Sequence, residues 1–328
     1  DDWQAINMFA GSDLSYYQDF EKHFNNSSKL KITTNYRSAY SIVNLSNDLM
    51  KNEEGSPAQC HQSSLGDIFL CKFDQAPQSS NEIALGIDKI ESLALRLIKN
   101  AIENKKEIVF LVRNNRIPYA TKNKSEPYNF LKKIRSYFNE SDHKKINIST
   151  IHQFKGKESD VIVLLDLRSN QYPSIHPDWK FNKIFGDNIP RLIDEERRLL
   201  YVALTRPLSS LILLVENIND PSPFLEDILS QKRGVNKSLK ELDWKNYPQT
   251  RLNKKSNLLV SFSSWGTLEI KDKLKSERFS YSSEDRSWTK NYSADEYSMA
   301  ALTAKLQNLL SNFKNKEIIK VKIVSDTE

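Results

Sequence analysis

The strongest constraint on the fold is a series of short runs that are almost continuous in Val, Ile and Leu. Such runs are typical of strands that are buried on both faces of a parallel sheet. Between them, residues 82–104 carry apolar side chains at helical spacing, and residues 194–204 form a second helical stretch. Alternating strands and helices predict an α/β domain with a parallel sheet. The expected strands are Gly66–Phe73, Glu107–Arg113, Ile146–Ile151, Asp160–Leu167 and Ser210–Glu216.

The end of the chain has a different pattern. It predicts a small α+β module with a strand at 257–262, a helix at 268–275, a strand pair within 279–292, a helix at 294–310 and a last strand at 318–324. A length of 328 residues suits more than one domain. We therefore expect a main domain over residues 1–230, a linker over 231–256 and the module over 257–328.

Positive charge is concentrated in the expected linker. Residues 232–255 hold eight Lys or Arg and two acidic residues, and 8 − 2 gives +6, the formal net charge of the whole chain. Two interpretations remain open. The strip is either a solvated linker or a surface that contacts phosphates.

Cysteine content and hydropathy limit the class of protein. The two cysteines, Cys60 and Cys71, form no CxxC pair and have no His nearby at zinc spacing, so we expect neither a structural metal nor a disulfide framework. A reduced, cytoplasmic setting fits best, and no apolar run reaches the length of a membrane span. The chain begins at Asp1 without Met and inside a motif, so we expect it to be a fragment of a longer protein.

One long string of residues indicates a catalytic role. Residues 195–206 read EERRLLYVALTR, a helix that ends by presenting the guanidinium of Arg206. A fork-shaped, permanently charged donor stabilises the negative charge that develops during phosphoryl transfer. The string resembles motif VI of UvrD/Rep-like superfamily 1 DNA helicases, and this resemblance implies that Arg206 is the arginine finger. Pro207 stands where the family usually has Ala.

A second string, TIHQFKGKE at residues 150–158, resembles motif V of the same helicases. It follows an expected strand, and ligands bind at the carboxyl ends of strands in α/β sheets. The resemblance implies that Thr150 and His152 face the DNA backbone and that Glu158 reaches the ribose of the nucleotide. Without this context, His152 would be interpreted as a residue with a structural hydrogen bond.

Two further strings fit the same order. Residues 35–38 (NYRS) resemble motif IV, which implies that Tyr36 stacks on adenine and that Arg37 contacts the γ-phosphate. The start of the chain resembles motif III, which implies that Gln4 senses the γ-phosphate and that Phe9 stacks on a base of single-stranded DNA. Its DWQAI wording is closest to the helicase IV branch.

Other candidate nucleic-acid contacts are less specific. Arg113 lies in LVRNN, which resembles motif IVa, and is either a contact to the DNA backbone or an exposed arginine at a strand end. In the final module, Phe279, Tyr281, Trp288 and Tyr292 alternate with basic residues. These aromatic rings either stack on bases or form the core of the module.

The resemblance covers residues 1 to about 230. It implies the second RecA-like, P-loop NTPase-type motor domain of an ATP-dependent DNA helicase or translocase, moving 3′ to 5′ on single-stranded or duplex DNA. The sequence has no G-x-x-x-x-G-K-[ST] loop and no DExx strand end. We therefore expect ATP and Mg²⁺ to be bound together with a first RecA-like domain that precedes Asp1, and this chain alone to be inactive.

Two alternatives to a helicase motor remain. A RecB-type helicase–nuclease subunit would need a carboxylate–Lys nuclease cluster after residue 206, and residues 231–328 show no such pattern. A catalytically inert nucleic-acid-binding scaffold could keep the fold without the activity. The presence of Gln4, Arg37, Glu158 and Arg206 argues against such decay.

Overall fold

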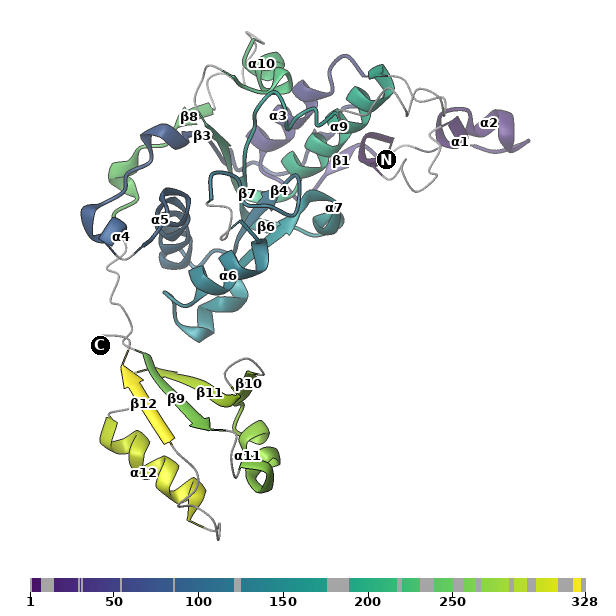
Figure 1. Cartoon of the computed structure of the whole chain (residues 1–328). Coiled ribbons are helices and arrows are strands. Elements are labelled where there is room, and N and C mark those ends of the chain that lie inside the picture. The colour runs from purple at the N-terminus through teal and green to yellow at the C-terminus, as the bar shows by residue number, and fades with distance from the viewer. Residues whose placement is uncertain are drawn as a thin grey trace. The chain divides into compact units, whose positions relative to one another are not determined.

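Two compact units, Asp1–Thr250 (unit 1) and Arg251–Glu328 (unit 2), make up the chain (Figure 1). The computed structural model describes residues 2–6, 15–28, 30, 32–53, 55–84, 86–120, 125–175, 189–216, 220–230, 239–249, 257–263, 267–282, 286–293, 299–311 and 321–325. Among these residues, no helix has the length and apolar character needed to cross a bilayer.

Unit 1 is built on a six-stranded sheet with the order β5-β4-β6-β7-β3-β8. All of its strand pairs are parallel. The strands are β3 (Asp67–Lys72), β4 (Ile108–Val112), β5 (Ile146–Thr150), β6 (Ser159–Leu164), β7 (Pro207–Val215) and β8 (Leu239–Glu241). A short parallel pair, β1 (Thr34–Asn35) with β2 (Gln59–Cys60), lies outside this sheet. The predicted α/β fold with a parallel sheet is confirmed.

Helices cover both faces of this sheet (Figure 1). On one face α3, α9 and α10 contribute to a core with alternate residues of the strands, such as Val109 and Leu111 of β4. Ile108 and Phe110, which point to the other face because strand side chains alternate, are also fully buried. That face is covered by α5 and α6 (Figure 1). The helices of unit 1 are α1 (Ser15–Gln18), α2 (Phe20–His23), α3 (Tyr40–Leu49), α4 (Ser80–Ala84), α5 (Lys89–Glu103), α6 (Pro127–Arg135), α7 (Ile151–Phe154), α9 (Ile189–Leu204) and α10 (Pro223–Ser230). Its 3-10 turns are Asp2–Gln4, Phe73–Gln75, Glu140–Lys145 and Trp244–Asn246.

The predicted helix over residues 82–104 is wrong as a single element. The structure has two helices, α4 and α5, and Gly86 between them has φ +66°, which ends the first helix. Asp88 then caps α5, and its backbone N–H donates to Glu91 Oε2 at 2.7 Å. This capping box restarts the helix, whereas the apolar periodicity continues through the break.

Part of the expected linker over residues 231–256 is folded into unit 1. Strand β8 pairs in parallel with β3, and Lys240 Nζ lies 3.0 Å from Asp67 Oδ1. Farther along, Tyr247 O accepts a hydrogen bond from Arg96. Unit 1 therefore extends to residue 250 and does not end at 230, and at least one cation of the basic strip is already paired.

Unit 2 is a four-stranded antiparallel sheet with the order β10-β11-β9-β12. Chain order and strand order together give the split β-α-β arrangement. Its elements are β9 (Asn257–Ser263), a 3-10 turn (Thr267–Ile270), α11 (Lys271–Ser276), β10 (Ser280–Ser282), β11 (Ser287–Ser293), α12 (Met299–Leu310) and β12 (Val321–Ser325). This sequence of elements agrees with the α+β pattern predicted for the module.

The aromatic side chains of unit 2 belong mainly to its core. Phe279, Trp288 and Tyr292 are 5%, 7% and 5% exposed and pack in one apolar cluster. Tyr281 is 49% exposed, and its ring lies 5.2 Å from that of Trp288. The core interpretation therefore holds for three of the four rings, and base stacking is open to Tyr281.

Candidate functional site

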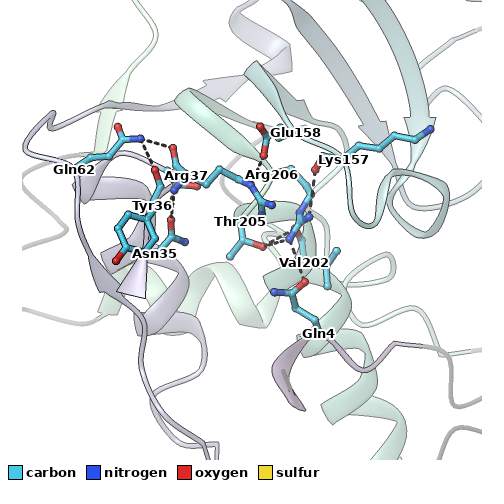
Figure 2. Close-up of polar contacts among 11 residues, drawn as sticks. Gln4, Asn35, Tyr36, Arg37, Gln62, Lys157, Glu158, Val202, Thr205 and Arg206 are labelled. Carbon is cyan, nitrogen blue, oxygen red and sulfur yellow. Dashed lines mark hydrogen bonds and ion pairs between the residues drawn. The ribbon is translucent and has the colours of Figure 1, made fainter. Parts of the chain in front are cut away.

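Arg206 is the second residue after the end of α9, and its side chain is turned into the protein (Figure 2). It is 1% exposed. Its Nε donates to Val202 O at 2.9 Å, Nη1 to Lys157 O at 3.2 Å, and Nη2 to Gln4 Oε1 at 3.3 Å and Thr205 Oγ1 at 3.0 Å. One guanidinium therefore joins three segments that the sequence separates, namely the motif III, V and VI strings.

The environment of Arg206 is desolvated and contains a second cation. Burial, and then the charge of Arg37, lower the pKa of Arg206 to about 10. The group stays protonated at neutral pH, but its charged form is disfavoured in the free protein. A bound anion would relieve this penalty, so the site is electrostatically suited to a phosphate.

A second cation, Arg37, lies beside Arg206. Arg37 Nε lies 2.5 Å from Glu158 Oε2, and the two side chains are 34% and 50% exposed. The loop that carries Arg37 is held from two sides. Asn35 Oδ1 accepts from the backbone N–H of Arg37 at 2.9 Å, and Gln62 Nε2 donates to the carbonyls of Tyr36 and Arg37 at 2.9 and 2.7 Å (Figure 2). Gln62 was missed by sequence reasoning because it belongs to no recognisable motif.

Tyr36 presents a flat ring at the edge of this cluster. It is 66% exposed, and its ring centroid lies 4.6 Å from that of His61. Beside it is a cavity of about 320 Å³ that also reaches Arg37 and Gln4. An aromatic ring and a cation that line one cavity can hold a base and a phosphate at once. The cavity is lined by Gln4, Ile32, Thr33, Thr34, Asn35, Tyr36, Arg37, Ala58, Tyr201 and Thr205.

These candidate nucleotide residues lie at the amino ends of the strands. Glu158 and Arg206 directly precede β6 and β7, whose first residues pair with each other. This differs from the expectation that the whole motif V site lies at the carboxyl ends. Thr150, the last residue of β5, does lie at a carboxyl end, because residues 151–158 cross from one edge of the sheet to the other.

The carboxyl edge holds the candidate DNA residues. Thr150 Oγ1 accepts from the backbone N–H of Gln153 at 3.3 Å, so it caps α7. His152 is half-buried, and burial followed by the charge of Arg113 lowers its pKa. At neutral pH His152 is therefore an uncharged imidazole, which can hydrogen-bond a phosphate but does not add a positive charge.

Arg113 is not an exposed arginine at a strand end. Its side chain is 18% exposed, and Nε and Nη2 both donate to the carboxylate of Glu196, the first at 3.0 Å and the second at a shorter distance. Burial lowers the pKa of Arg113, but the hydrogen bonds and charge of Glu196 raise it overall above the ordinary value. Any DNA phosphate must compete with this ion pair.

A second cavity of about 320 Å³ opens beside Arg113. Arg116, whose side chain is exposed, and Arg168 also line it. Arg168 is paired with Asp166 and Glu216. Sequence reasoning missed Arg116, although it follows Arg113 within the same loop. Phe9, the expected base-stacking residue, lies outside the described residues.

The described residues contain no group of three or more His, Cys, Asp or Glu side chains arranged to hold a metal ion. The two cysteines are free, and burial raises the pKa of Cys71 to about 12. Cys71 is therefore an inert thiol at neutral pH.

Comparison with known proteins finds similarity to helicases. Residues 120–217 match the family model of the UvrD-like helicase C-terminal domain. This part of the chain is therefore similar to the C-terminal domain of UvrD-like helicases. DNA helicase IV of Escherichia coli (strain K12) is 26% identical over 230 residues, which make up 69% of this chain and 30% of the relative. The resemblance to UvrD-like helicases found in the motif strings is thus confirmed.

The matched region spans less than a third of the length of helicase IV. A solved structure, the C-terminal domain of a possible DNA helicase from Lactobacillus plantarum WCFS1, matches 63% of this chain and 99% of its own at 12% identity and a TM-score of 0.35. The similarity to helicases therefore depends on the two sequence matches.

Proposed function

We propose that this chain is the second motor domain of an ATP-dependent DNA helicase or translocase. The observation that carries the proposal is the meeting of Gln4, Arg37, Glu158 and Arg206, from four motif strings: Arg206 donates to Gln4, Arg37 pairs with Glu158, and Gln4 and Arg37 line one cavity. Tyr36 would stack on the base, Glu158 would bind the ribose, and the two arginines would contact the γ-phosphate. ATP would be bound between this domain and a first RecA-like domain, which would also hold Mg²⁺.

ATP binding requires a rearrangement of the two arginines. Arg37 pairs with Glu158 and Arg206 is turned toward Gln4 and the end of α9. A γ-phosphate would replace these internal acceptors, and hydrolysis would let them return. Cycles of this exchange would open and close the cleft between the two motor domains and move the strand, in the 3′ to 5′ direction that the family resemblance implies.

Single-stranded DNA would bind along the carboxyl edge of the sheet. Thr150, His152 and the cavity beside Arg113 lie there, and Phe9 would add a stacking contact. Arg116 supplies an exposed cation at this edge. We therefore propose Arg116 as a phosphate contact in addition to Arg113.

The isolated chain should bind DNA without hydrolysing ATP. It has no G-x-x-x-x-G-K-[ST] loop to cradle the triphosphate. Phosphate release by the purified chain should stay at background with and without single-stranded DNA, while the complete protein should show DNA-stimulated turnover. Robust, DNA-stimulated hydrolysis by residues 1–328 alone would contradict the division of labour between two motor domains.

Arg116→Gln should weaken single-stranded DNA binding by the chain and reduce its salt dependence. Each phosphate contact contributes about −0.7 to the slope of log affinity against log salt, so the slope should become shallower by about that amount. The measurement is fluorescence anisotropy across a salt series. Lys105→Gln is the matched control, because Lys105 is exposed and precedes β4 at the opposite edge of the sheet. Equal slopes for Arg116→Gln and the unchanged chain would remove Arg116 from the DNA path.

A further inference from the structure

Helix α9 connects the two edges of the sheet. Arg206, the second residue after its end, lies at the amino edge with the candidate nucleotide residues. Glu196, in its middle, contacts Arg113, which directly follows β4 at the carboxyl edge. Leu204, the last helical residue, lies eight positions after Glu196, which corresponds to about 12 Å along the helix. One helix therefore reaches both the candidate DNA edge and the candidate nucleotide site.

Glu196 is the acceptor at the carboxyl edge. Its carboxylate accepts two hydrogen bonds from the guanidinium of Arg113 and one from the backbone N–H of Ser174, the last at 3.0 Å. The Glu196 side chain is 9% exposed. A bidentate, largely buried pair fixes both position and orientation of its partners. The charge of Glu196 also acts on His152 and raises its pKa, against the larger lowering by burial and Arg113.

Residues of two motif strings thus meet at this acceptor, and its charge acts on a residue of a third. Arg113 comes from the motif IVa string, His152 from motif V and Glu196 from motif VI. The Arg113 guanidinium lines the cavity at the carboxyl edge while it is bound to Glu196. A DNA phosphate in that cavity would compete directly with the Glu196 carboxylate for the same donors.

The other half of α9 is suited to transmit a displacement. Residues 198–204 are all buried, so the helix is packed against the core along this length. Arg198 Nε donates to Ala5 O at 3.2 Å, and Arg206 donates to Gln4 at 3.3 Å. The segment with Gln4, the expected γ-phosphate sensor, is therefore attached to the same helix. Packed helices shift as rigid elements between discrete arrangements.

We propose that Glu196 is a positioning residue that couples DNA binding at the carboxyl edge to the placement of Arg206 at the nucleotide site. This inference rests on the proposed helicase function. Arg113 has two alternative acceptors, the Glu196 carboxylate and a DNA phosphate. Binding of the strand weakens the hold of Arg113 on Glu196, and α9 then moves Arg206 and Gln4 toward their positions in the closed site. Coupling of this kind needs an element with two arrangements that both ligands bias.

The test compares Glu196→Gln, Arg113→Gln and the double variant in the complete protein. Typical coupling free energies correspond to factors of about 5 to 150. We expect Glu196→Gln to reduce the stimulation of ATP hydrolysis by single-stranded DNA about 5- to 20-fold. Its affinity for DNA should stay equal or rise, because Arg113 is then free to bind phosphate. The double variant should lose no more stimulation than the more affected single variant, since both changes break the same contact.

Three controls separate coupling from damage to the fold. Glu195→Gln changes the adjacent charge on α9 and should keep full stimulation. Glu196→Asp keeps the charge and should restore part of the stimulation. The double variant leaves no unpaired buried charge, so its melting temperature should stay closer to that of the unchanged protein than the melting temperature of either single variant.

Full stimulation in a folded Glu196→Gln protein, or losses from Arg113→Gln and Glu196→Gln that simply add in the double variant, would overturn the coupling role. The proposed function fails in a different way. In that case the unchanged complete protein shows no DNA-stimulated hydrolysis at all, so the variants cannot be compared by their loss of stimulation.

Discussion

Replacing Arg206 with alanine should lower ATP turnover of the complete protein by about 10³-fold or more, which is the usual loss when an arginine finger is removed. Nucleotide binding should be largely retained, because the substitution leaves Tyr36 and Glu158, the proposed contacts to the base and the ribose, in place. The measurements are steady-state hydrolysis with saturating DNA and equilibrium binding of a fluorescent nucleotide. Unchanged hydrolysis would remove Arg206 from the site.

Burial of Arg206 makes a stability control necessary. The alanine variant leaves the acceptors Val202 O and Lys157 O without their donor. The melting temperature should therefore be measured together with turnover. Arg206→Lys keeps a positive charge but loses the planar fork, so it should also be strongly impaired. A variant that melts normally and hydrolyses slowly identifies a catalytic loss rather than an unfolded protein.

Trp288→Ala should unfold or strongly destabilise unit 2 rather than remove one base contact. Trp288 is 7% exposed and packs with Phe262 and Phe279 in the core of that unit. Truncation of a buried Trp typically costs about 3–5 kcal/mol, a large part of the stability of so small a unit. Chemical denaturation of the chain, followed by circular dichroism, should show an early transition that corresponds to unit 2.

Tyr281→Ala is the matched control for Trp288→Ala. Tyr281 lies on the neighbouring strand but is 49% exposed, so its loss should change stability much less. If unit 2 binds single-stranded DNA by stacking, Tyr281→Ala should instead weaken binding by about 1–3 kcal/mol with little change in salt slope. A folded Trp288→Ala protein with weakened DNA binding would restore Trp288 as a stacking residue.

The local pattern of apolar residues was sufficient to predict most of the helices and strands. The apolar runs that become β4 and β6 are buried on both faces, and this burial is the physical origin of their continuous Val, Ile and Leu content. Strand β8 was missed because it has three residues and two of them are charged. Its pairing with β3 is a tertiary contact, which no local pattern records. The break at Gly86 was missed because helical periodicity on either side hid a single residue with positive φ.

The sequence by itself determined the resemblance to UvrD-like helicases. Strings such as residues 195–206 are recognised from the type and order of their residues, without knowledge of the fold. It also determined the parallel sheet, because periodicity follows from burial along each segment. Only the tertiary structure decided what the site arginines contact. Arg113 pairs with Glu196 across 83 positions, and Arg206 meets Gln4 across 202. Such partners are chosen by packing between distant segments, which also put Glu158 and Thr150 of a single motif at opposite edges of the sheet.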